Sequence, residues 1–141
     1  MADFIVIGDY DASIHAEILD SLIRSNSAII EVCEDRAISQ MRSYLNKRYD
    51  CDAIFSATGS DRHPLVLMFA IDIAIYHMFC IHNPYKISAI RKERYDAAIE
   101  WLKAVADSNI NIDGAPMLPD EEVAENSRWQ IVSNEHHNNY F

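Results

Sequence analysis

The sequence has few of the residues that interrupt regular structure. It contains three glycines and four prolines among 141 residues, which is too few for a β-sandwich or barrel with its many tight turns. Hydrophobic residues make up 50% of the chain, which is enough for one compact domain to bury a core. These proportions favour one compact domain that is not all-β.

Basic residues are also scarce. Twelve Lys and Arg residues stand against 22 Asp and Glu residues, which gives a formal net charge of −10. Binding to nucleic acid depends on clustered Lys and Arg side chains, so we expect no direct affinity for nucleic acid. An anionic membrane surface is an equally poor partner. Acidic chains of this kind usually stay soluble and contact other proteins.

The cysteines do not form a recognisable pattern. Cys33, Cys51 and Cys80 are odd in number and widely spaced, and no CxxC pair occurs. This spacing supports neither a zinc site nor a redox motif, and we expect reduced thiols in a cytosolic protein. The first residues lack the basic start and the longer apolar run of a signal peptide.

Apolar residues recur at helical spacing in four segments, which predict four helices. The segments are residues 11–23, 27–49, 65–82 and 88–109.

The remaining segments lack a helical period. Residues 1–10 alternate apolar and polar side chains and predict an extended lead-in, and residues 50–63 predict a connecting loop. We therefore predict an all-α fold, with a four-helix domain over residues 1–112 and an irregular, acidic C-terminal arm over residues 113–141.

The third predicted helix is apolar nearly all the way round. A membrane span needs about 20 apolar residues, whereas this segment is shorter and carries Asp72 at its centre and His77 further on. A core helix surrounded by the other helices fits this composition better than a membrane span.

Asp72 is the one carboxylate in this apolar segment. A buried carboxylate is costly unless it is paired or hydrogen-bonded, and Arg48 and Arg94 each lie on the apolar stripe of another predicted helix. We predict a structural ion pair between Asp72 and Arg48, Arg94 or both. The alternative is a catalytic or ligand-binding Asp72.

Motifs that carry catalysis or bind cofactors are missing. The sequence has no HExxH, no GxSxG and no glycine-rich phosphate loop. Ser60 and His63 lie near each other without an orienting acid, and His136 and His137 are expected to be solvated. We predict no catalytic residue, no cofactor site and no metal site.

The predicted arm carries acidic residues and isolated aromatic ones. Its six acidic residues and one Arg give it a formal charge of −5, half of the excess in the whole chain. Trp129, Tyr140 and Phe141 are candidate anchors for a partner protein, because a few aromatic side chains often dominate the energy of an interface. Alternatively, Trp129 packs on its own domain.

Three motifs occur in order: RSYLNKRY, PLVLMFAIDIAIYHMF and RKERYDAAIEWLKAVADSNINI. Together they resemble a virion-morphogenesis family of Mu-like prophages over roughly residues 10–112. The matching positions are Tyr44, Leu45, Arg48, Tyr49, Asp72, Ile73, Ala74, Tyr76, Arg94, Tyr95, Ala98, Trp101 and Leu102. The sequence has Ser108 and Asn109 where family members commonly end the last helix with glycine, and Asn tolerates the same left-handed cap.

The resemblance implies a role in virion assembly. The family is similar to the helical head-completion or head–tail adaptor proteins of long-tailed phages, which form a ring under the portal and bridge it to the tail. It implies a non-enzymatic connector subunit in the host cytoplasm and the virion, with copies of itself and portal or tail proteins as partners. Two alternatives remain: a small helical regulator or inhibitor of a host protein, and an enzyme with its site around Asp72 and Arg94.

Overall fold

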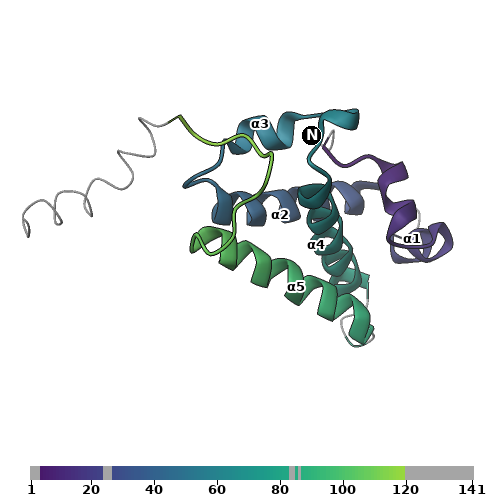
Figure 1. The fold of residues 1–141 in the computed structure, drawn as a ribbon. Coiled ribbons are helices and arrows are strands. Elements are labelled where there is room, and N and C mark those ends of the chain that lie inside the picture. The colour runs from purple at the N-terminus through teal and green to yellow at the C-terminus, as the bar shows by residue number, and fades with distance from the viewer. Residues whose placement is uncertain (1–3, 24–26, 83–84, 86, 120–141) are drawn as a thin grey trace, which may run out of the picture.

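The computed structural model describes residues 4–23, 27–82, 85 and 87–119, and this part of the chain is all-α (Figure 1). No β-strand occurs among these residues, as the sequence predicts. The elements in chain order are η1 (Ile7–Ala12), α1 (Ala16–Ile23), α2 (Ser27–Leu45), α3 (Cys51–Ser56), η2 (Gly59–Asp61), α4 (Pro64–His82) and α5 (Ala89–Ala106), where η marks a 3₁₀ helix.

Helix α4 forms the centre of the domain and packs against α1, α2 and α5. Its buried residues lie on all sides of the helix: Val66, Ala70, Ile71, Asp72, Ile73, Ala74, Ile75 and Met78. By length and composition alone α4 is apolar enough to cross a membrane. In the structure it has the surroundings that the sequence predicts for a core helix.

Two of the helices packed against α4, namely α2 and α5, present regular apolar stripes to the core. In α2 the stripe includes Ala37, Met41 and Leu45, and in α5 it includes Ala98 and Leu102. Residues at i and i+4 share one face of a helix, so each stripe buries a continuous surface.

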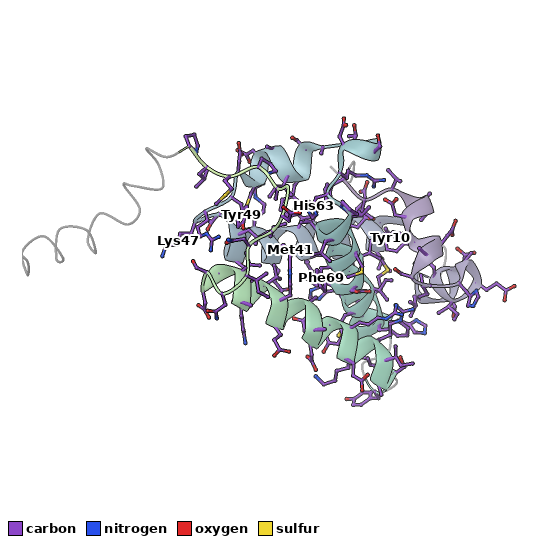
Figure 2. All side chains as sticks on the ribbon, viewed as in Figure 1. Tyr10, Met41, Lys47, Tyr49, His63 and Phe69 are labelled. Atoms are coloured by element: carbon purple, nitrogen blue, oxygen red, sulfur yellow. The ribbon has the colours of Figure 1, made fainter. Side chains whose placement is uncertain are left out.

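Aromatic side chains reinforce the contact between α4 and α5. Phe69 stacks on Trp101 with ring centroids 4.6 Å apart, and Tyr76 stacks on Tyr95 at 3.9 Å. Met41 and Phe69 lie near the middle of the domain, with Tyr10 and Tyr49 on opposite sides of them in this view (Figure 2).

The connecting loop predicted over residues 50–63 is wrong in detail, because it contains α3 and η2. The Asp50 side chain caps α3 by accepting a hydrogen bond from the backbone N–H of Ala53 at 3.1 Å. An Asp cap satisfies one of the free N–H groups at the start of a helix. Six residues are too few for a helical period to be recognised, so the sequence pattern missed α3.

The N-terminal prediction also needs correction. The end of the extended lead-in forms η1, and the first predicted helix is divided into η1 and α1 by residues 13–15. The carboxylate of Asp9 accepts a hydrogen bond from Val6 N–H at 2.8 Å and so holds the first turn of η1. The short 3₁₀ helix fits the alternating sequence because it needs no four-residue apolar repeat.

The start of the predicted arm is attached to the domain. Asp50 N–H donates to Pro116 O and Leu118 N–H donates to Arg48 O, each at 3.0 Å, and Tyr49 pairs with Met117 in an isolated antiparallel bridge. Residues 113–119 therefore lie against the segment between α2 and α3 and do not leave the domain at residue 112. The rest of the arm lies outside the described residues.

Candidate functional site

Asp72 is buried, as the sequence predicts, with 8% of its surface exposed. Burial raises the pKa of its carboxyl group, and the positive charges of Arg94 and Arg91 lower it by less. The ion pairs within the described part of the chain are Arg42–Asp52, Arg62–Asp9 and Lys92–Asp96, and none includes Asp72. The predicted direct pair is thus replaced by a longer-range interaction with two arginines of α5.

Arg91 was not predicted to lie near Asp72. Its Nη2 donates to the backbone O of Ser13, while its Nη1 is buried and has no hydrogen-bond partner among the residues that the structure describes. Arg91 therefore joins the start of α5 to the segment between η1 and α1. Its position could have been found from the sequence, because Arg91 and Arg94 are three residues apart and such residues lie side by side on a helix.

Arg48 does not pair with Asp72, and this part of the prediction is wrong. Its guanidinium donates to Val105 O at 3.2 Å, to Ser108 Oγ at 2.7 Å and to Asn111 Oδ1. These acceptors lie at and beyond the C-terminal end of α5, where helical carbonyl groups lack partners and a positive charge is favourable.

Just beyond the end of α5, one residue has the left-handed backbone conformation that the family resemblance implied, and it is Ser108, not Asn109. Ser108 has a φ of 66°, a conformation that costs energy for residues other than glycine. The bond from Arg48 to Ser108 Oγ helps to hold this turn. Beside it, Tyr49 Oη accepts a hydrogen bond from Ile112 N–H at 2.8 Å.

Glu34 is a second buried carboxylate, which the sequence analysis did not single out. It is 2% exposed and accepts a hydrogen bond from Tyr10 Oη at 2.6 Å. Burial raises the pKa of Glu34 to about 7, against which the bond from Tyr10 acts more weakly. Its signal was present, because Ile30, Glu34, Ala37 and Met41 continue one helical stripe.

Asp9 and Arg62 form a largely buried ion pair, with side chains 14% and 11% exposed. Arg62 also donates to Phe4 O at 2.8 Å and to Gly59 O at 2.8 Å. Burial raises the pKa of Asp9, but the hydrogen bonds from Arg62 and Val6 outweigh burial and lower it overall. The pair fixes the N-terminal segment to the residues that precede α4.

His63, which the sequence places near Ser60, has a structural contact elsewhere in the domain. His63 Nε2 lies 2.7 Å from Asp113 O, which attaches the segment after α5 to the start of α4. Across the described residues, no group of three or more His, Cys, Asp or Glu side chains is arranged to hold a metal ion. Trp129, Tyr140, Phe141, His136 and His137 lie outside those residues.

The surface has an open groove between α2 and α3, with a volume of about 740 Å³. Asp35, Ile38, Ser39 and Arg42 line it from α2, and Asp52, Phe55 and Ser56 line it from α3. We call this surface the α2–α3 groove. Its mixed apolar and charged lining suits contact with a protein.

The sequence profile of the family described as Bacteriophage Mu, Gp36 matches residues 9–131. No curated protein and no solved structure matches the chain. The family match runs from within η1, through every α-helix of the domain, and past the residues attached to the segment between α2 and α3. The resemblance to a Mu-like phage family is thereby confirmed: the chain belongs to the family Bacteriophage Mu, Gp36, and is a phage structural or morphogenesis protein.

Proposed function

We propose that this protein is a head–tail connector subunit that completes the phage head. It acts by protein–protein contacts in a homo-oligomeric ring, between the portal and the tail. The observation that carries the proposal is the family match over residues 9–131, which includes every α-helix described in the domain.

The polar interior supports a structural and non-enzymatic role. Arg48 holds the end of α5, Arg62 holds the N-terminal segment, and Arg91 joins α5 to Ser13. Each of these interactions connects segments that are distant in sequence. Asp72 lies within the helical core and is 8% exposed, whereas a catalytic carboxylate needs access to substrate.

The excess negative charge has a use in such a ring. If the ring surrounds the path of the DNA, acidic residues on its lumen repel phosphate over a Debye length of about 8 Å at physiological ionic strength. DNA can then pass without binding to the wall. We therefore expect part of the −10 net charge to lie on the lumen of the ring.

The test is to mix the purified protein with the portal protein and the tail-end proteins of its own phage, and to examine the complexes by electron microscopy. We expect rings bound to one of these partners. A phage that lacks the gene should accumulate separate heads and tails, and the protein supplied in trans should restore joined particles.

The result that contradicts the proposal is also definite. A chain that binds none of the virion proteins, and instead forms a stoichiometric complex with one host protein, would be a regulator or inhibitor. The control is an unrelated acidic helical protein of similar size, which should bind neither portal nor tail proteins.

A further inference from the structure

We infer that copies of this chain contact one another head to tail, with the start of α5 of one copy seated in the α2–α3 groove of the next. The inference rests on the proposed ring-forming function. It goes further by naming the two surfaces that would meet at each subunit boundary.

The receiving surface is apolar at its base and acidic at its rim. Ile38 and Phe55 supply the apolar lining, and Asp35 and Asp52 supply two negative charges. The guanidinium of Arg42 lies 2.7 Å from Asp52 and compensates one of these charges. One formal negative charge therefore remains, and an apolar side chain next to a cation would match this surface.

The start of α5 has the complementary character, and we call Ile90, Arg91 and Arg94 the α5 basic face. Ile90 is 62% exposed, Arg94 is exposed and Arg91 is partly exposed. The two arginines lie near the single carboxylate of Asp72. This face thus combines an exposed apolar side chain with two arginines whose positive charge exceeds the one negative charge of Asp72.

The arrangement of the helices keeps these two surfaces apart within one molecule. Helix α3 lies at the top of the domain and α5 at the bottom, with α2 and α4 between them (Figure 1). The groove residues Asp35 and Ser39 lie on the outer side of α2, away from the side that carries Ala37 and Met41 into the core. One copy cannot bring its own two surfaces together.

A contact between two different surfaces is heterologous. It leaves one free surface of each kind on every dimer, so that further copies add until a ring closes. A contact of a surface with its own copy would instead stop at a dimer. The complementary charges of the α5 basic face and the groove favour the heterologous contact, because two copies of either surface would repel each other.

Two charge changes on exposed residues test the inference: Ile90→Asp on the α5 basic face and Asp35→Arg in the groove. Sedimentation of wild type over a range of concentrations at low salt should show oligomers larger than a dimer. Each variant alone should stay monomeric. An equimolar mixture of the two should stop at a dimer, because each variant keeps one intact surface.

The double variant with both changes in one chain keeps neither surface intact and lacks the apolar contact of Ile90, so it should stay monomeric. Matched controls are Ile18→Asp on α1 and Glu100→Arg on α5, which place the same kinds of charge on exposed residues outside both surfaces. Both controls should assemble as wild type does, and circular dichroism should show every variant folded.

The inference is overturned if wild type stays monomeric, or if either single variant assembles as wild type does. It is also overturned if the mixture forms complexes larger than a dimer. None of these results decides the proposed function, because binding of the wild-type protein to portal or tail proteins is measured separately. A protein that assembles as described but binds neither partner would overturn the proposed function alone.

Discussion

Replacing Glu34 by Gln should stabilise the protein at neutral and alkaline pH. Glu34 is 2% exposed and accepts a hydrogen bond from Tyr10 Oη at 2.6 Å. Its pKa is about 7 in the folded protein against an ordinary value of 4.5. The folded state therefore holds this proton to higher pH than the unfolded state does, and ionisation of Glu34 opposes folding.

The size and sign of the effect follow from these two pKa values. Each pH unit between them is worth about 1.4 kcal/mol, so ionised Glu34 costs roughly 3 kcal/mol of folding free energy. The cost is absent below the unfolded pKa, grows as the pH rises through the interval between the two values, and is constant above the folded pKa. The amide of Gln cannot ionise, but its oxygen can still accept the hydrogen bond from Tyr10.

The assay is chemical denaturation of wild type and Glu34→Gln at a series of pH values from about 5 to about 8. The gain of the variant over wild type should rise from under about 1 kcal/mol at the acidic end to roughly 3 kcal/mol at the alkaline end. Glu100→Gln, the same change at an exposed position on α5, should show no such rise. A gain from Glu34→Gln that is independent of pH, or a loss of stability near pH 8, would refute the reasoning.

Three further predictions concern the arginine and aspartate contacts. Asp72→Asn should change the free energy of unfolding by less than about 1 kcal/mol, because Asp72 has no direct ion pair within the described residues to lose. Breaking a direct buried ion pair would cost about 3–5 kcal/mol, and urea denaturation distinguishes the small change from the large one. Arg48→Met removes the donors at the end of α5 and should cost about 2–3 kcal/mol, while the exposed Arg36→Met should cost much less in the same thermal melts. Arg62→Met should cost about 3 kcal/mol at neutral pH by leaving Asp9 partly buried without its partner. The pKa of Asp9 is lowered in the folded state. The stability lost in Arg62→Met should therefore shrink as the pH falls through and below the ordinary value of 3.8. Equal losses at neutral and acidic pH would contradict this prediction.

The sequence by itself determined the main helices and the central place of α4. Segment 65–82 is apolar on every side, and only a helix with neighbours all round it can bury such a surface. The start of α5 was also readable, since Ser88 accepts a hydrogen bond from Arg91 N–H as a capping side chain does. The burial of Asp72 followed from its position in the same apolar segment.

Short elements were beyond the reach of the sequence pattern. Helix α3 has six residues, and its stability depends on the Asp50 cap and on burial of Ile54 against the rest of the domain. Helix periodicity is recognisable only over several turns. A short helix of this kind is fixed by tertiary contacts more than by its own residues.

Only the tertiary structure decided which charged groups meet. Arg48 lies on an apolar stripe that equally suits a partner on α4 or α5, and the packing of the helices places it at the end of α5, beside Ser108. The same packing places Tyr10 against Glu34 and brings Arg91 near Asp72. Periodicity fixes the side of a helix on which a residue lies, because that is a local property of the backbone. The partner across the core depends on how far each helix is shifted and rotated against the next, which is set by the close packing of all the side chains together.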